Sequence, residues 1–355
     1  MKASEAQLAE RLKAVDAAVE RLLPTLPQFQ GLYDMFRYHV GWLDPSLRRI
    51  EGPAGKKLRP TLCLLVADTV GDGWQRAVPA AAAVELVHNF SLVHDDIEDR
   101  SALRRYRETL WTVWGDAQAI NVGDAVLVLA QRALAEAETL SAEVGLAALR
   151  LLNEACLGLC EGQYLDLLWE REAVVTVEQY LEMIERKTAR LFACAAELGA
   201  LCSGASADAQ RQAALFGSSL GMAFQAVDDL LGVWSPEAET GKPAELDLAS
   251  RKKSLPAVLG LAAPASAEAD RFRALFGLDR QLSADETAEA RQILNHLGIH
   301  EKASAYARRY HDEALSHLDL PAVQDQAQPL REFAEMTLAE AYGGSSSDST
   351  ALQTK

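Results

Sequence analysis

Two groups of aspartates follow apolar segments of the chain and could together hold metal ions. The first group is Asp95, Asp96 and Asp99 in the stretch DDIED, and the second is Asp228 and Asp229 in DDLLG. Residues four apart share one face of a helix, so Asp95 and Asp99 are expected to point the same way. Crowded carboxylates raise one another's pKa unless a cation lies between them, and their oxygens suit Mg²⁺. The spacing therefore predicts a magnesium site, although either group alone could be a solvated acidic helix end.

The helices that would carry these acids are expected over 85–99 and 215–231. The C-terminal end of a helix carries the negative end of its dipole, so aspartates there lower helix stability and point to another role. We expect the two helix ends to face each other across one cavity, where magnesium ions would bind a diphosphate.

Basic motifs near the first aspartates could bind phosphate oxygens. Lys56 and Arg59 lie in the loop GKKLRP, before an expected helix that runs to about Val70, and a helix N-terminus with flanking cations suits an anion. Arg104 and Arg105 follow the first aspartate group, where cations can contact phosphate oxygens that a metal leaves uncovered. A plain basic loop is the competing interpretation of the GKKLRP motif.

The composition favours an all-helical protein. The chain has 355 residues, of which 49% are hydrophobic and 24% charged, which is enough for a large core. Alanine and leucine dominate, and proline is sparse within the long segments. The net charge of −16 argues against nucleic-acid binding, because phosphate backbones attract basic surfaces. With no apolar run long enough to span a membrane and no signal-peptide core, we predict a cytoplasmic protein without a transmembrane segment.

The five cysteines are predicted to be buried thiols in a reducing cytosol. Cys156 and Cys160 share a helix face, but no further His or Cys nearby would complete a zinc site. The other three are Cys63, Cys194 and Cys202.

Long helices are expected to make up most of the chain. Besides the two aspartate-bearing helices, the segments that we expect to be helical are 3–23, 28–43, 141–170 and 176–203, and four more helices are expected within 256–341. The tail over 342–355 is rich in Gly and Ser and is expected to be disordered. We therefore expect one domain over 1–341.

Taken together, the motifs resemble the trans-isoprenyl diphosphate synthases, also called polyprenyl synthetases. Seven short motifs occur in the family's order between Gly55 and Pro256, including GKKLRP, DDIED, EGQYLD, ERKTARL and DDLLG. The resemblance implies an all-α fold, in which ten or more mostly antiparallel helices form a single bundle around a central cavity. It also implies a homodimer and small-molecule diphosphate substrates.

The family pattern assigns a role to each matching residue. Isopentenyl diphosphate would be bound by Lys56, Arg59, His88 and Arg105. The cations that would hold the allylic diphosphate are Arg104, Lys187 and Lys242, with Thr188, Gln225 and Lys252 as further substrate-binding residues. Three Mg²⁺ ions, for which Mn²⁺ can substitute, would be bound by Asp95, Asp99 and Asp228, with Asp96 and Asp229 as further catalytic carboxylates.

Two other pairs in the resemblance leave alternatives open. Gln163 and Asp166 match the family's GQxxD and could orient substrate, or could simply form a hydrogen bond between helices. Lys252 aligns with the last lysine of the pattern, and Asp247 is a candidate partner for it.

The chain departs from the family pattern in two motifs. Tyr106 and Glu108 replace the Gly and Pro of RRGxPT, which we expect to change the stiffness of the loop but not to remove activity. Gly232 replaces the last aspartate of the second DDxxD, and we expect Gly232→Asp to change metal affinity only modestly.

The resemblance implies that isopentenyl diphosphate condenses with dimethylallyl, geranyl or farnesyl diphosphate by ionisation, condensation and elimination. Phe90 and Ser91 precede Asp95 by five and four residues, and a large side chain at either place could act as a floor for the growing product. One aromatic at the more distant place goes with geranylgeranyl diphosphate in the family. Farnesyl diphosphate and products of twenty-five or more carbons are the alternatives, and Phe90 could also be ordinary core.

Three other classes of protein compete with this interpretation. A class I terpene cyclase would ionise the same group without needing Lys56, Arg59 and His88. A non-catalytic subunit of a heteromeric prenyl synthase would be expected to lose the first aspartate group, which this chain keeps. An acidic helical interaction protein would not place cations at so many matching positions.

Overall fold

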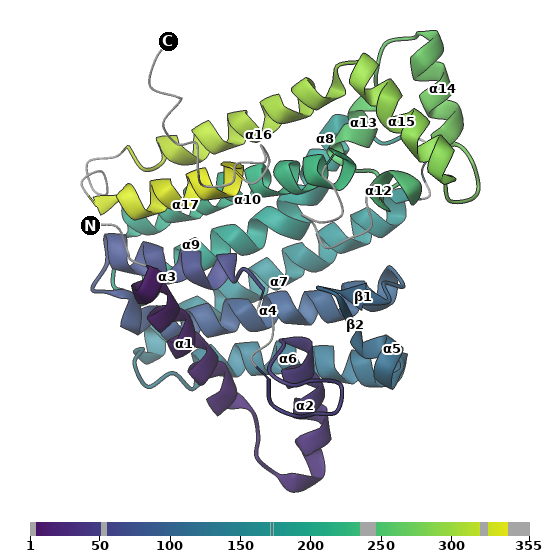
Figure 1. Ribbon diagram of the computed structural model, residues 1–355. Coiled ribbons are helices and arrows are strands. Elements are labelled where there is room, and N and C mark those ends of the chain that lie inside the picture. The colour runs from purple at the N-terminus through teal and green to yellow at the C-terminus, as the bar shows by residue number, and fades with distance from the viewer. Residues whose placement is uncertain are drawn as a thin grey trace. The chain divides into compact units, whose positions relative to one another are not determined.

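The computed structural model describes residues 5–50, 55–170, 172, 174–234, 246–319 and 326–339. Regular structure in these ranges is almost entirely α-helical, which confirms the all-α prediction (Figure 1). The strands described there, β1 (Leu103–Arg104) and β2 (Arg107–Glu108), form a small antiparallel hairpin. Lys242, the segment around it and the predicted tail over 342–355 lie outside the described residues.

Contacts divide the chain into two compact units, which we describe separately. The first comprises Met1–Leu157, Leu191–Gly217 and Leu320–Leu330, and the second comprises Gly158–Arg190, Ser218–Asp319 and Arg331–Lys355. The predicted single domain around a central cavity stays a prediction.

The helices of the first unit surround α4, which carries the first aspartate group. They are α1 (Glu5–Leu22), η1 (Pro27–Phe29), α2 (Gln30–His39), α3 (Leu58–Val70), η2 (Trp74–Ala77), α4 (Val78–Glu98), α5 (Leu110–Trp114), α6 (Asp116–Ala135) and most of α9 (Arg190–Cys202). Every residue from Ala80 to Val84 is buried, because their small side chains let α3 and α6 pack closely against α4 (Figure 1). A helix that is apolar on all sides belongs in a core.

The second unit contains the second aspartate group, at the C-terminal end of α10. Its elements are α8 (Val177–Ile184), the π-helical turn η3 (Glu185–Ala189), α12 (Leu246–Ala249), α13 (Leu255–Leu261), α14 (Ala267–Phe276), α15 (Ala284–His296) and α16 (Ile299–Ser316). Besides α9, whose first residue is in the second unit, three described helices have residues in both units, namely α7 (Ala142–Glu170), α10 (Ala207–Trp234) and α17 (Gln328–Ala339). Thr176 and Gln179 form a capping box that starts α8, in which each side chain bonds the other's backbone N–H.

Several predicted elements need correction. The helix expected over 176–203 is interrupted by the π-helical turn Glu185–Ala189, and the helix expected over 28–43 ends at His39. Five helices, not four, are described between 255 and 339. Among the cysteines, which are all described, no disulfide forms, but Cys160 is exposed and not buried as predicted.

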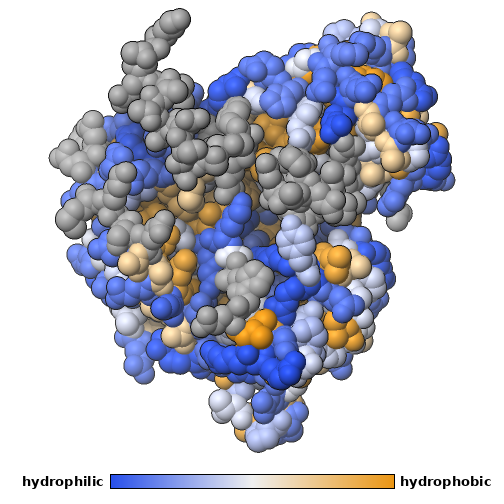
Figure 2. All heavy atoms as spheres, in the orientation of Figure 1, coloured by the Kyte–Doolittle hydropathy of each residue, from blue (hydrophilic) through white to orange (hydrophobic). Residues whose placement is uncertain are grey.

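Hydrophilic side chains cover most of the described surface that Figure 2 shows, with apolar residues scattered among them. Nowhere in the described ranges does a helix combine the length and the apolar character that crossing a membrane would require.

Candidate active site

One carboxylate of the first aspartate group is buried, and the other two are more accessible to solvent. Asp96 is 2% exposed, and its two oxygens accept bonds of 2.9 and 3.0 Å from Nε of Arg104. Burial raises the pKa of Asp96, and the Arg104 guanidinium opposes that rise. Asp95 is partly buried and Asp99 is exposed, so these two carboxylates can reach a ligand in solvent. Asp96, by contrast, uses both of its carboxylate oxygens to bind Arg104.

Arg104 and Arg105 lie in the β1–β2 hairpin, where the family's Gly and Pro are missing. Arg105 and Tyr106 form its two-residue turn with φ of 51° and 62°. The backbones of Arg104 and Arg107 lie opposite each other in the antiparallel pair. Positive φ at both turn residues matches the twist of a tight hairpin but is unfavourable for side chains other than Gly, Asn or Asp. The guanidinium of Arg105 lies so close to Gly55 that a Cβ there would be 2.3 Å from Nη2. The glycine of GKKLRP therefore makes room for Arg105.

Residues predicted to bind isopentenyl diphosphate cluster beside this hairpin. Nη1 of Arg59 lies 3.5 Å from Nε2 of His88, and the Arg59 guanidinium carbon lies 4.5 Å from the Phe192 ring centroid. Burial, followed by the charges of Arg59 and Arg105, lowers the pKa of His88 well below its usual value. His88 is therefore neutral at pH 7 and can hydrogen-bond without adding charge. Lys56, the fourth predicted residue, is exposed.

Glu85 is a member of this cluster that the sequence patterns did not reveal. Its Oε1 accepts a bond of 3.0 Å from Nδ2 of Asn89. Burial raises the pKa of Glu85, while Lys57, Asn89, Arg105 and Arg59 oppose the rise. The only signal in the sequence is an acid one turn before His88 on an apolar helix, which fits a carboxylate that orients the neighbouring cations.

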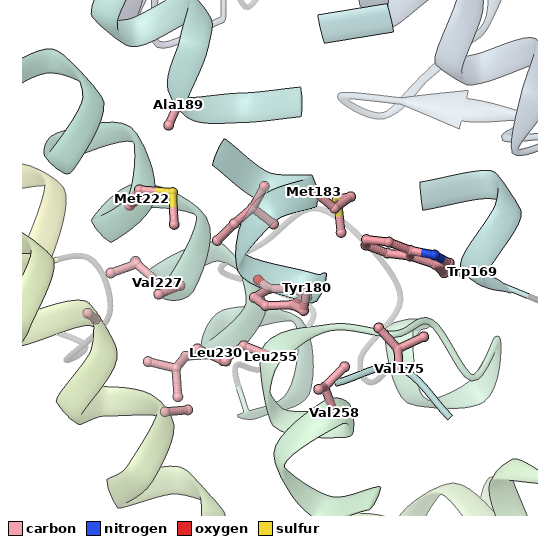
Figure 3. Close-up of a cluster of buried hydrophobic side chains, with 14 residues drawn as sticks. Trp169, Val175, Tyr180, Met183, Ala189, Met222, Val227, Leu230, Leu255 and Val258 are labelled. Carbon is pink, nitrogen blue, oxygen red and sulfur yellow. The ribbon is translucent and has the colours of Figure 1, made fainter. Parts of the chain in front are cut away.

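The second aspartate group shows the same separation. Asp228 is exposed, whereas Asp229 is buried and accepts three hydrogen bonds, from Tyr180 Oη (2.5 Å), Leu255 N (2.6 Å) and Gln225 Nε2 (2.9 Å). Burial raises the pKa of Asp229 to about 6, although the three donors oppose the rise. Figure 3 shows Tyr180 in the middle of the surrounding apolar cluster. Asp229 thus ties α8 and the start of α13 to α10, and its direct catalytic role stays a prediction.

The π-helical turn places Lys187 and Thr188 beside their polar partners. Nζ of Lys187 lies 2.6 Å from Oδ2 of Asp166, and Oγ1 of Thr188 donates to Oε1 of Gln225 at 2.7 Å. Burial alone would raise the pKa of Asp166, but Lys187 and Lys252 lower it. The predicted polar contact to a neighbouring segment is therefore present at Asp166, and its role in orienting substrate stays a prediction. The extra residue of a π turn is common at functional sites.

Gly162 explains how the turn can approach α7 so closely. A Cβ at Gly162 would lie 2.2 Å from the backbone N of Lys187, so a larger residue would push the turn away. The glycine in EGQYLD is therefore a packing requirement for the predicted lysine.

Gly232 lies in close contact with Asp247, which its sequence position did not suggest. A Cβ at Gly232 would lie 2.3 Å from Oδ2 and 3.1 Å from Cγ of Asp247, so the carboxylate of Asp247 occupies the space of the missing side chain. Asp247 also contributes to the raised pKa of Asp229. A carboxylate from α12 therefore lies where the family pattern has one on α10.

Replacing Gly232 tests this packing. Helix propensity alone predicts that Gly232→Ala gains up to about 1 kcal/mol. The steric conflict with Asp247 predicts instead that Gly232→Ala and Gly232→Asp each lose about 1–3 kcal/mol of unfolding free energy in urea titrations. The double variant with Asp247→Gly should recover most of the loss. Single variants as stable as the wild type would contradict the close contact.

The chemistry of the carboxylates fits Mg²⁺. No group of three or more His, Cys, Asp or Glu side chains within the described ranges is arranged to enclose a metal by itself. Mg²⁺ usually takes one or two protein carboxylates and completes its shell with water and substrate phosphates. Asp95 in the last turn of α4 and Asp99 directly after that helix suit that mode in the first unit, and exposed Asp228 suits it in the second.

Comparisons with known proteins agree with these motifs. A polyprenyl synthetase family model matches residues 40–294. A (2E,6E)-farnesyl diphosphate synthase of Mycobacterium tuberculosis is 41% identical over 308 residues, covering 84% of each chain. A geranylgeranyl diphosphate synthase of the same organism is 43% identical over 272 residues, covering 76% of each chain.

Solved structures give the same result. The crystal structure of a polyprenyl synthetase from Streptomyces coelicolor A3(2) is 38% identical and superposes with a TM-score of 0.83, covering 92% of this chain and 96% of that one. The all-helical fold is thus shared, and the chain belongs to the polyprenyl synthetase family of prenyltransferases, which make isoprenyl diphosphates.

Proposed function

We propose that the protein is a Mg²⁺-dependent synthase that condenses isopentenyl diphosphate with an allylic diphosphate, with geranylgeranyl diphosphate as its main product. The observation that carries this proposal is the separation of the aspartates. Asp96 and Asp229 are buried and bonded within the protein, whereas Asp95, Asp99 and Asp228 are the more accessible ones. The accessible three are those to which we assign Mg²⁺.

In the proposed reaction, the C1–O bond of the allylic substrate breaks and its electron pair leaves with the diphosphate. Mg²⁺, when bound, neutralises charge on that leaving group. Lys187 and Arg104 add hydrogen bonds to its oxygens, which stabilise the charge as it develops. Arg59, His88 and Arg105 orient isopentenyl diphosphate so that its double bond attacks C1. A proton then leaves C2 of the isopentenyl unit for an oxygen of the departed diphosphate.

The test is an assay with labelled isopentenyl diphosphate and dimethylallyl, geranyl or farnesyl diphosphate as primer, followed by chromatography of the dephosphorylated products. We expect linear prenyl alcohols. Cyclic hydrocarbons formed from the allylic substrate alone would favour a class I terpene cyclase. Activity only after addition of a second, different chain would favour a heteromeric synthase.

Product length is proposed to depend on Phe90. Phe90 is 6% exposed, and its ring centroid lies 4.9 Å from that of His94 in an edge-to-face contact. Ser91 is small, and its Oγ donates to the backbone oxygen of His88 at 2.9 Å. Relatives of this chain include both farnesyl and geranylgeranyl synthases, so the floor of the cavity needs its own test.

We expect Phe90→Ala to lengthen the product by at least one isoprene unit, because it removes the floor, and Ser91→Phe to shorten it by adding a ring one residue nearer Asp95. Chromatography of the products from each primer measures both effects. Phe272→Leu, at a buried ring in the second unit, is the control for lost aromatic packing. Wild-type products from both variants would place the floor elsewhere, for example within 127–134.

The proposed homodimer has a candidate surface on α7. Large apolar side chains are exposed at Leu146 (53%), Leu157 (62%), Tyr164 (64%) and Leu168 (43%). Their spacings of eleven, seven and four residues place them on one face of the helix. An apolar stripe of this length commonly marks a protein interface, and a second copy of the chain is the proposed occupant.

Leu157→Glu is expected to shift the protein from dimer to monomer in light scattering after size exclusion, because the charge would be buried in the interface. Leu26→Glu, at another exposed apolar residue (53% exposed), should leave the mass unchanged. A dimer retained in Leu157→Glu would argue against this surface.

A further inference from the structure

A small pocket in the first unit lies beside the β1–β2 hairpin and is strongly basic. Its lining includes His39 at the end of α2 and three arginines of the hairpin, Arg104, Arg105 and Arg107. The two acidic residues of the lining are Asp96, which is already bound to Arg104, and Glu108. The three arginines of the lining therefore outnumber its two carboxylates, so the pocket carries excess positive charge and excess hydrogen-bond donors.

Two polar atoms of this pocket are buried without a hydrogen-bond partner among the described residues. They are Nε2 of His39 and Nη1 of Arg107. A buried polar group without a partner costs about 1–3 kcal/mol, so each such atom calls for an explanation. Two of them in one basic pocket are explained together by an oxyanion that binds there.

Arg107 is held in place by its other contacts. Nη2 donates to the backbone oxygen of Leu43 at 2.5 Å, and the guanidinium carbon lies 4.3 Å from the ring centroid of Tyr38. Tyr38 is itself fixed by a bond of 2.8 Å from its hydroxyl to the backbone oxygen of Glu108. Nη1 of Arg107 is therefore a pre-positioned donor, which lowers the entropy lost on binding an anion.

His39 offers a neutral donor beside these cations. Burial, followed by Arg104, Arg105 and Arg107, lowers the pKa of His39 to about 3, so its ring is uncharged at pH 7. His39 as a residue is only partly buried, but its Nε2 is buried. The ring also forms a hydrogen bond with the Asn89 side chain. In the tautomer that carries the proton on Nε2, the ring presents a hydrogen-bond donor to an anion in the pocket.

We propose that His39 and Arg107 bind a phosphate group of isopentenyl diphosphate together with Arg105. This inference rests on the proposed function and adds two residues to its substrate site. His39 lies near enough to His88 to affect its pKa, so the pocket adjoins the Arg59–His88 cluster. That neighbourhood assigns the pocket to isopentenyl diphosphate and not to the allylic substrate.

The test measures binding of isopentenyl diphosphate by calorimetry in the absence of allylic substrate. His39→Phe keeps a ring and Arg107→Met keeps an apolar stem, and each is expected to weaken binding by about tenfold, which corresponds to one lost hydrogen bond to a charged group. Arg107→Lys should restore part of the affinity. The apparent KM for the allylic substrate should stay within about twofold. Thermal unfolding verifies that each variant is folded.

Arg132→Gln serves as the matched control, because the Arg132 side chain is 41% exposed and pairs with Glu136 one turn away. Nitrogen-15 spectra of histidine-labelled protein give a readout that a structural role would not produce. The chain has seven histidines, so the resonances of His39 can be assigned by comparison with His39→Phe. Addition of isopentenyl diphosphate is expected to shift the Nε2 resonance of His39.

The outcomes separate this inference from the proposed function. Unchanged affinity in both variants, an unshifted His39 resonance, or an equal loss of allylic affinity would overturn the His39–Arg107 subsite, while turnover by the wild type would leave the proposed function standing. A wild type that binds isopentenyl diphosphate through His39 but forms no prenyl product with any primer would overturn the proposed function and keep the subsite.

Discussion

Asp95→Ala and Asp228→Ala are each expected to lower kcat/KM by about a thousandfold or more, because each removes a carboxylate proposed to bind Mg²⁺. Circular dichroism should show unchanged helical content. Asp95 is only partly buried and Asp228 is exposed, so neither change leaves a cavity in the core. Kinetics over a range of Mg²⁺ concentrations would show whether part of the activity returns at high metal.

Two further variants test whether the loss of activity is specific to the aspartates that are proposed to bind Mg²⁺. Asp208→Ala, at an aspartate that is paired with Arg211 on the surface, should behave like the wild type. Asp229→Asn should instead lower the free energy of unfolding by about 1–3 kcal/mol, because Tyr180 and Leu255 donate to that carboxylate. Wild-type turnover that persists in excess EDTA would contradict the proposed metal dependence.

Arg59→Ala is expected to weaken isopentenyl diphosphate binding by about 2–3 kcal/mol, or roughly 30–150-fold, because it removes a charge-assisted contact to phosphate. Arg59 lies against His88 and the Phe192 ring, so its guanidinium is already oriented in the free protein. Apparent KM values for both substrates, measured with the other at saturation, give the comparison. The allylic value should change by less than about threefold.

Arg76→Ala is a suitable control, since Arg76 belongs to a surface pair with Asp72. If Arg59→Ala raised both KM values equally, the assignment of GKKLRP to isopentenyl diphosphate would be wrong. Loss of the cation–π contact with Phe192 also affects packing, so the unfolding midpoint of Arg59→Ala should be measured beside its kinetics.

The sequence by itself determined the helical class, the family and the residue types of the site. These depend on local properties: helix propensity, apolar periodicity, and the short spacings within DDIED and GKKLRP. Helix α10, Ala207–Trp234, contains the helix predicted over 215–231 for the same reason, although it begins eight residues earlier and ends three residues later. The sequence also singled out Arg59, which lies in the GKKLRP motif, and His88, which the family resemblance indicated.

Only the tertiary structure decided which aspartates are accessible. Asp95 and Asp96 are neighbours in one motif, as are Asp228 and Asp229, yet one of each pair is buried and bonded to partners outside its motif. Burial of a carboxylate depends on donors from other elements, and no spacing within a motif records them.

The same physical reason explains the other surprises. The π-helical turn at Lys187 can approach α7 closely because residue 162 is a glycine. The space beside Gly232 is occupied by the carboxylate of Asp247, which belongs to a different helix. His39 and Arg107 stand in ordinary sequence contexts, and folding alone makes their buried atoms partners for an anion. Residues that act through a short motif can be predicted from the sequence, whereas contacts between segments that are distant in the sequence depend on the fold.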